Sequence, residues 1–165
     1  MMLPEETLAM AERTLAMLRA RRWRLATAES CTGGLVTAAL TQIAGSSDVV
    51  EYGFVTYANA AKTDLLGVPE ALIAAEGAVS EAVARAMAEG ALARAGADVA
   101  VSITGIAGPD GGSADKPVGL VWFGCATHAG IEVRRRIFAG DRAQVRAQAV
   151  ATALELVIGA ALVAA

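Results

Sequence analysis

The stretch ATAESCTGGLV, residues 26–36, joins an apolar run to a helix-like pattern through a polar corner. The corner holds Glu29, Ser30, Cys31 and Thr32 in consecutive positions, and two glycines follow. Backbone N–H groups at a helix start have no partner within the helix, so they suit an oxyanion or a phosphate. The stretch therefore predicts a strand, a turn and a helix, with a candidate reactive site in the turn.

Strands and helices alternate along the rest of the chain. Helices are expected over residues 4–21, 35–43, 59–66, 80–96 and 141–162, and strands over residues 23–28, 48–58, 97–104, 118–128 and 131–138. The last two strands read as a hairpin around Ala129 and Gly130. We therefore expect an α/β fold, a three-layer α/β/α sandwich with a mixed β-sheet, in a single domain over residues 1–165.

The composition narrows the classes of function. A net charge of −3 over 165 residues does not favour nucleic-acid binding, which usually needs a basic excess. Two cysteines, Cys31 and Cys125, suit a reducing compartment, and the acidic N-terminus does not resemble a signal peptide, so the cytoplasm is expected. The single histidine, His128, leaves no transition-metal ligand set, although carboxylates can still hold Mg²⁺; no metal and no cofactor are expected.

The C-terminal stretch LVIGAALVAA, residues 156–165, carries no charge. Its ten residues are too few to cross a bilayer, so no membrane association is expected. A helix that is apolar all round should be buried, and full burial is hard to arrange at the end of a small domain. We therefore expect this stretch to contribute to a homodimer contact; the alternative is burial on the sheet of its own subunit.

Two side chains at the corner are candidate nucleophiles. Ser30 would lie beside the free N–H groups of the helix start, as a serine beside its own oxyanion hole. The alternative is that Ser30 or Thr32 only caps the helix. Cys31 is a rival nucleophile because a helix start lowers the pKa of a thiol, but it can equally be a small buried apolar residue.

A serine nucleophile needs a base, and the chain offers few. His128 lies at the end of a hairpin strand, where a solvated side chain is common. Of fourteen basic residues only Lys62 and Lys116 are lysines. Arginine does not lose its proton, whereas a desolvated lysine can act as a base. Each lysine can also be a solvated charge.

Two further segments are candidates for ligand binding. TGIAGPDGGSADKP, residues 104–117, follows a buried strand and would emerge at the carboxyl end of the sheet, where α/β folds bind ligands. It matches neither a Walker A loop nor the G-x-G-x-x-G spacing, so a surface turn is the alternative. GDRAQVR, residues 140–146, puts Arg142 and Arg146 on one helical face, where they can clamp a phosphate or stay exposed.

Five motifs in order, TAESCTGG, GFVTYANAAK, SITGIAGPDGG, KPVGLVWFG and GDRAQVR, closely resemble the CinA C-terminal domain family. The resemblance runs from about residue 4 to residue 160. It implies the activity of stand-alone members, nicotinamide-nucleotide amidohydrolases that convert nicotinamide mononucleotide (NMN) to nicotinate mononucleotide and ammonia in pyridine nucleotide recycling. Larger members carry an extra N-terminal domain, and the resemblance does not imply the activity of that domain for this chain.

The resemblance also implies roles for individual residues. Ser30 aligns with the family's proposed nucleophile and Lys62 with its proposed base, whose pKa would have to fall toward neutrality through burial or a nearby cation. Tyr57, in the same motif, would relay a proton or orient Lys62. The residues expected to bind the substrate or its oxyanion are Cys31, Thr32, Gly33, Gly34, Thr104, Gly105, Gly108 and Arg142. Glu29 receives no definite role.

A second class of function stays open. The family's historical link to competence and DNA damage allows a non-catalytic module that binds a nucleotide or a protein partner. The presence of both Ser30 and Lys62 favours the enzyme, because a binding module needs neither.

Overall fold

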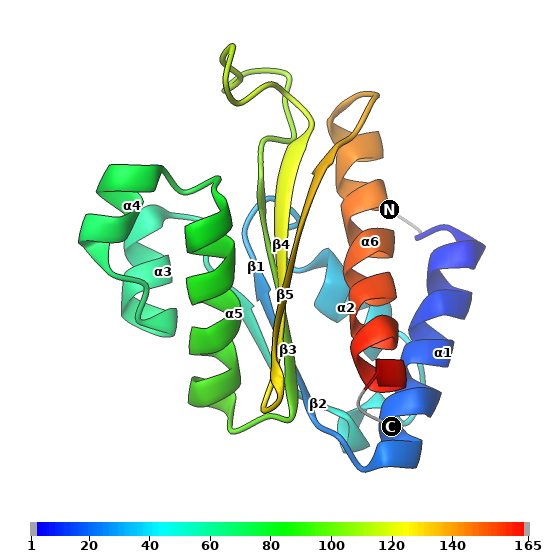
Figure 1. The fold of residues 1–165 in the computed structure, drawn as a ribbon. Coiled ribbons are helices and arrows are strands. Elements are labelled where there is room, and N and C mark those ends of the chain that lie inside the picture. Colours follow the sequence, from blue (N-terminus) through cyan, green and yellow to red (C-terminus); the bar gives the residue numbers. More distant parts are fainter. Residues whose placement is uncertain (1–2, 164–165) are drawn as a thin grey trace.

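A five-stranded sheet forms the centre of the structure, a computed structural model that describes residues 3–163 (Figure 1). Its strands are β1 (Leu25–Glu29), β2 (Val50–Val55), β3 (Val99–Gly105), β4 (Leu120–Thr127) and β5 (Gly130–Ile137). The spatial order is β2-β1-β3-β4-β5. β1 runs parallel to β2 and β3, whereas β4 is antiparallel to both β3 and β5. The mixed sheet is therefore confirmed.

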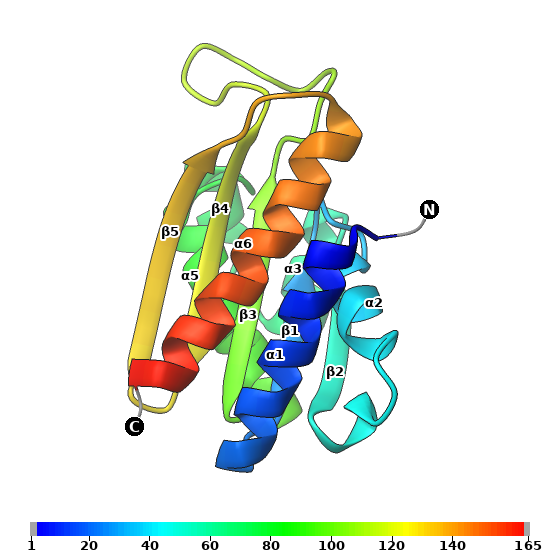
Figure 2. The same ribbon diagram turned by 90° about the vertical axis from the view of Figure 1, so that its right-hand side faces the viewer.

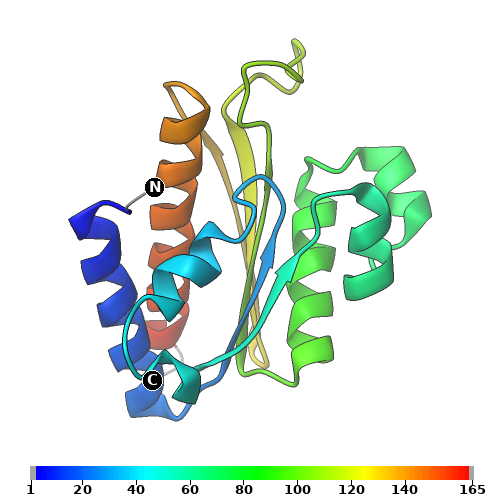
Figure 3. The ribbon, with the colours of Figure 1, turned by 180° about the vertical axis from the view of Figure 1, so that it is seen from behind.

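Helices cover both faces of the sheet. They are α1 (Glu5–Arg21), α2 (Leu35–Thr41), α3 (Asn59–Leu66), α4 (Glu70–Glu76), α5 (Glu81–Ala95) and α6 (Arg142–Val163). Figures 1 and 3 show α1, α2 and α6 on one face and α3, α4 and α5 on the other. Figure 2 shows α1 and α6 side by side. The three-layer α/β/α sandwich is confirmed.

The central strands are buried because both of their faces are covered. All five residues of β1 are buried, and so are the first six of β3. Small side chains let the layers approach closely, and Gly90 in the middle of α5 is the clearest case. A Cβ atom at this position would collide with the carbonyl oxygen of Leu66, the last residue of α3. The absence of a side chain at Gly90 therefore lets α3 lie directly against α5.

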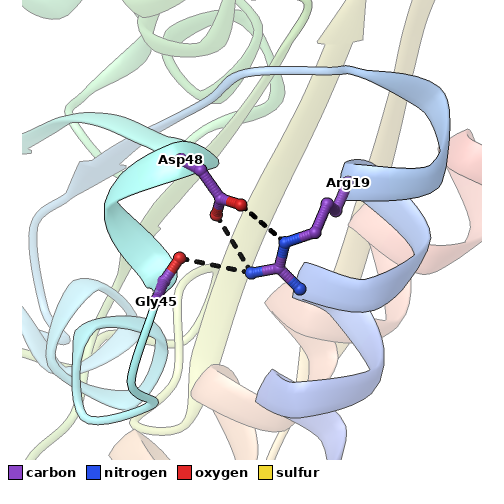
Figure 4. A network of polar contacts seen from close by, with 3 residues as sticks. All are labelled: Arg19, Gly45 and Asp48. Carbon is purple, nitrogen blue, oxygen red and sulfur yellow. Dashed lines mark hydrogen bonds and ion pairs between the residues drawn. The ribbon is translucent and has the colours of Figure 1, made fainter.

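A surface ion pair joins α1 to the turn that precedes β2 (Figure 4). Arg19 Nε lies 2.6 Å from Asp48 Oδ2, and its Nη2 donates to Asp48 Oδ1 at 3.0 Å and to the carbonyl oxygen of Gly45 at 3.2 Å. The Arg19 guanidinium lowers the pKa of Asp48 below its ordinary value. The contact links α1 to the turn from which β2 starts.

The sequence missed one helix. α4 begins directly after Pro69, in a stretch for which no helix was expected. The helix has seven residues and no capping side chain, so its apolar periodicity is too short to predict a helix from the sequence. A short 3₁₀ turn at Ser46–Asp48 was also not expected.

Residues 156–163 are only partly buried within their own subunit, and the homodimer contact expected through residues 156–165 stays a prediction. Leu156, Val157 and Ala161 are buried, whereas Leu162 and Val163 are exposed; residues 164–165 lie outside the described part. The buried residues of this stretch are covered because α6 packs against both the sheet and α1. α6 has the length and apolar composition of a membrane-crossing helix, but half of its most apolar window is buried inside the protein, as in a core helix.

Candidate active site

The polar corner lies at the carboxyl end of β1. Ser30 follows β1 directly, and its N–H donates to the carbonyl oxygen of Ile103 in β3 at 2.9 Å. Gly33 and Gly34 then take positive φ angles of 58° and 99°, a region that favours glycine. These two residues turn the chain sharply from β1 into α2, and Ser30 is left at the turn with 8% of its surface exposed.

Lys62 reaches this corner from α3, which follows β2 (Figure 3). Its Nζ lies 3.0 Å from Ser30 Oγ, and the residue is 1% exposed. The same Nζ donates to the carbonyl oxygens of Thr56, at 2.7 Å, and Tyr57, at 3.3 Å. A neutral amine has two hydrogens and one lone pair. With both hydrogens directed at carbonyl oxygens, the lone pair of neutral Lys62 faces the hydroxyl of Ser30.

Burial tunes the two candidate reactive groups in opposite directions. It lowers the pKa of Lys62 to about 8, because a buried ammonium loses its hydration. It raises the pKa of the Cys31 thiol to about 12, because a buried thiolate is equally disfavoured. The expectation that the helix start activates Cys31 was therefore wrong: the thiol lies too deep, and it belongs to the apolar core.

A cavity of about 210 Å³ opens beside Ser30 Oγ at the carboxyl end of the sheet. Its lining consists of Ser30, Cys31, Tyr57, Asn59, Lys62, Ala78, Val79, Thr104, Gly105, Ala107 and Arg142. Lys62 and Arg142 are the charged residues in this lining, so an anionic ligand is favoured. Of the residues expected at the site, those absent from the lining are Thr32, Gly33, Gly34 and Gly108.

The helix start offers fewer free N–H groups than expected. The N–H of Gly33 donates to the carbonyl oxygen of Ser30 at 3.0 Å, and the N–H of Gly34 donates to Glu29 Oε2 at 3.1 Å. Within residues 3–163, no protein oxygen accepts from the N–H groups of Cys31 and Thr32. Of the four N–H groups expected to be free at residues 31–34, only those of Cys31 and Thr32 therefore remain available to a ligand.

Neither hydroxyl at the corner caps α2. Ser30 Oγ contacts Lys62, and among the described residues Thr32 Oγ1 has no hydrogen-bond partner. The residue that caps α2 is Glu29, whose carboxylate accepts from the N–H groups of Val36 at 3.0 Å and Thr37 at 2.8 Å. The role that sequence reasoning left open for Glu29 is thus a structural contact at the start of this helix.

Tyr57 and Arg142 meet at the outer edge of the cavity. Arg142 Nη2 lies 3.3 Å from the hydroxyl of Tyr57, and its Nη1 donates to the carbonyl oxygen of Gly108 at 2.9 Å. Tyr57 contacts Lys62 only through its backbone carbonyl, and its exposed side chain points to Arg142. Tyr57 can therefore orient Lys62 through the backbone, whereas its phenol is placed to meet a ligand.

Arg142 and Arg146 do not form one clamp. Asp141 and Gln144 make a reciprocal capping pair, which fixes the first turn of α6 and thus Arg142. One turn later, Arg146 Nε donates to the carbonyl oxygen of Cys31 and its Nη2 to that of Thr32, both at 3.1 Å. Arg146 therefore holds the backbone of the polar corner, and of the two arginines only Arg142 lines the cavity.

The other two candidate bases lie away from Ser30. His128 is exposed in the β4–β5 turn, next to Thr127, which pairs with Val99 at the far end of β3. Lys116 Nζ donates to the carbonyl oxygen of Glu76 at the end of α4, at 2.6 Å. Neither side chain lines the cavity, so Lys62 is the base that the geometry favours.

The chain matches the model of the CinA C-terminal domain over residues 7–161. The chain belongs to the CinA C-terminal domain family. It is 57% identical, over 85% of its length and 86% of the relative's, to nicotinamide-nucleotide amidohydrolase PncC of Enterobacter agglomerans. It is 54% identical to nicotinamide-nucleotide amidohydrolase PncC of Escherichia coli K12, over 93% of its own length and 94% of the relative's. The structure superposes on the crystal structure of competence/damage inducible protein CihA from Agrobacterium tumefaciens with a TM-score of 0.93 at 46% identity. The match covers 96% of this chain and 98% of the other.

Four lining residues of this CinA domain were not expected from the sequence. Ala78 and Val79 come from the linker before α5, and the hydroxyl of Thr104 holds this linker by donating to the carbonyl oxygen of Ala78 at 2.8 Å. No polar atom marks these two residues in the sequence. Asn59 lies inside the motif GFVTYANAAK and Ala107 inside SITGIAGPDGG, and these positions were the available signal.

Proposed function

We propose that this CinA domain is an amidohydrolase that deamidates NMN to nicotinate mononucleotide and ammonia. The observation that carries the proposal is the buried contact of 3.0 Å between Lys62 Nζ and Ser30 Oγ at the wall of the cavity. The names of the PncC relatives, more than half identical over most of the chain, supply the substrate.

In the first half of the reaction, Ser30 Oγ attacks the carbonyl carbon of the nicotinamide carboxamide. Neutral Lys62 takes the hydroxyl proton, since its lone pair faces Ser30. The developing oxyanion is stabilised by the N–H groups of Cys31 and Thr32, which no protein oxygen uses within residues 3–163. Charged Lys62 then protonates the departing nitrogen, and ammonia leaves behind a nicotinoyl ester on Ser30.

In the second half, a water molecule takes the place of ammonia. Lys62 accepts a proton from the water, the water oxygen attacks the ester carbonyl, and the proton returns to Ser30 Oγ as nicotinate mononucleotide leaves. The same pair of side chains serves both halves, because each half needs one proton moved from the attacking group to the leaving group.

The outer part of the cavity suits the ribose phosphate. Arg142 brings a positive charge to the rim, where it bridges Tyr57 and the loop residue Gly108. The loop over residues 104–112 lies beside it and would contact the ribose. Thr104 donates its hydroxyl hydrogen to Ala78, so toward the substrate it would act as an acceptor, for example of a carboxamide N–H.

Release of ammonia from NMN by the purified protein tests the proposal directly. Turnover that yields equal amounts of ammonia and nicotinate mononucleotide is expected. A protein that binds NMN without turnover would instead be the non-catalytic module considered above.

Exhaustive chelation should leave this turnover unchanged. The cavity lining contains no carboxylate and no histidine, and the amide oxygen of Asn59 and the buried thiol of Cys31 are too few ligands to hold a divalent ion. The measurement is the rate of NMN hydrolysis after dialysis against EDTA, with untreated protein as control. A loss of activity that one particular divalent ion restores would contradict the serine–lysine mechanism.

We further propose a cytoplasmic homodimer that acts on a small molecule, without a nucleic-acid or membrane partner. The reduced cysteines and the net charge of −3 support the compartment and the absence of nucleic acid. Light scattering at micromolar concentration should give twice the chain mass of 16.7 kDa. A mass of one chain would contradict the dimer.

A further inference from the structure

Glu29 is a fully buried carboxylate immediately before the nucleophile. Its exposed fraction is 0%, and the ion pairs of residues 3–163 do not include it. A buried carboxylate is costly unless it is hydrogen-bonded. The serine–lysine reaction assigns no proton or charge to Glu29, so its presence at this position needs another explanation.

Four donors from one short segment satisfy the carboxylate. Oε2 accepts from the N–H groups of Gly34, at 3.1 Å, and Val36, at 3.0 Å. Oε1 accepts from the N–H of Thr37 at 2.8 Å and from its hydroxyl at 2.9 Å. Since all four partners donate, the carboxylate matches them and a carboxamide cannot, because its NH₂ group would face other donors.

The same contacts decide which backbone groups remain for a reaction. Glu29 occupies the N–H groups at the start of α2, and a turn contact uses that of Gly33. Two contacts therefore restrain the backbone of Cys31 and Thr32. Glu29 holds the start of α2 that follows these residues, and Arg146 donates to the carbonyl oxygens of both residues. Each contact restrains a segment that adjoins Ser30.

We infer that Glu29 is a positioning residue for the nucleophile. By fixing the start of α2, its carboxylate sets where Ser30 Oγ points relative to Lys62 and where the N–H of Cys31 points relative to the oxyanion. This inference rests on the proposed role of Ser30 as nucleophile. It does not require that Glu29 touch the substrate.

Glu29→Gln keeps the size of the side chain and removes the match to its donors. We expect kcat for NMN to fall about 100-fold, since a displacement of about 1 Å in reacting groups has effects of that order. KM should stay within about twofold, because Arg142 and the outer cavity are untouched. The midpoint of the pH profile should also stay near 8, since Lys62 does not contact Glu29. Glu29→Asp, which keeps the charge, should recover part of kcat.

Two control variants separate positioning from general loss of stability. Leu40→Ala weakens the packing of α2 at a fully buried residue without touching the carboxylate. Thr37→Val removes one of the four donors and should give a smaller fall in kcat than Glu29→Gln. The inference is overturned if Glu29→Gln stays within twofold of the wild type, or if Leu40→Ala, at an equal loss of melting temperature, lowers kcat as much.

A substrate-independent probe keeps this test distinct from that of NMN hydrolysis. An alkyl fluorophosphonate forms a bond from Ser30 Oγ to phosphorus and releases fluoride, and mass spectrometry locates the adduct. Glu29→Gln should slow this labelling about as much as it lowers kcat, whereas equal labelling rates would overturn the inference. If the wild type is labelled but does not hydrolyse NMN, the proposed substrate fails and the labelling comparison still decides the role of Glu29.

Discussion

Ser30→Ala should fold normally and hydrolyse NMN at least about a thousand-fold more slowly, because loss of the nucleophile removes the covalent route. Ser30 is small and lines the cavity, so deleting its hydroxyl leaves little additional empty space. The measurement is kcat by ammonia release, with circular dichroism to confirm the fold.

Cys31→Ala is the matched control for this change. The thiol neighbours Ser30 in sequence, but burial raises its pKa to about 12, so little thiolate exists near neutral pH. This variant should keep most of its activity. Retained turnover in Ser30→Ala, together with its loss in Cys31→Ala, would move the nucleophile to the cysteine.

Lys62→Arg should lower kcat at least about a hundred-fold while NMN still binds with similar affinity, since general-base contributions have this size. Arginine keeps the positive charge but does not deprotonate near neutrality. For the wild type, kcat/KM should rise with pH through about 8, because the neutral form of Lys62 is the active one. The rise should be absent in Lys62→Arg.

Lys116→Arg makes the same chemical change at the other lysine, whose Nζ contacts a carbonyl oxygen of α4 outside the cavity. It should behave as wild type. An active Lys62→Arg, combined with a Lys62→Ala variant that mainly raises KM, would show that Lys62 anchors the substrate and is not the base. A bound water or Tyr57 would then be the remaining candidate.

The depressed pKa of Lys62 also links stability to pH. The unfolded chain, with an ordinary lysine pKa of 10.5, binds more protons than the folded chain in the range between about 8 and 10.5. The contribution of Lys62 to the free energy of unfolding therefore rises with pH across this range and is lowest below it.

The layered architecture follows from patterns that are local in the sequence. β3 reads as a continuous apolar run because it is covered on both faces, and α5 carries its own signals, a Ser80 cap and a terminal Gly96. α4 ends at Gly77 but has only seven residues and no capping side chain at its start, so its place depends mainly on packing against α3 and α5. Elements with local signals were therefore predicted, and the element held mainly by tertiary contacts was not.

The candidate site shows the same contrast between features that the sequence predicted and features that depend on tertiary contacts. Ser30 and Lys62 were candidates from their residue types alone, beside Cys31 and Lys116, and the resemblance to the CinA family selected them. The hydrogen-bond partners of the backbone groups at the corner could not be predicted, because contacts such as those from Gly34 to Glu29 or from Arg146 to Cys31 depend on the folded geometry. The number of N–H groups left free at the corner was overestimated for this reason.

Gly90 lies outside the cavity lining, yet its missing side chain bears on the position of Lys62. Leu66, whose carbonyl faces Gly90, lies one helical turn after Lys62, so the depth at which α3 rests on α5 also determines how far Lys62 reaches toward Ser30. Packed interiors do not yield smoothly to an added atom, and a methyl group at position 90 would displace α3 as a unit. A substitution at position 90 would therefore disturb the contact between Lys62 and Ser30, although Gly90 is not part of the cavity lining.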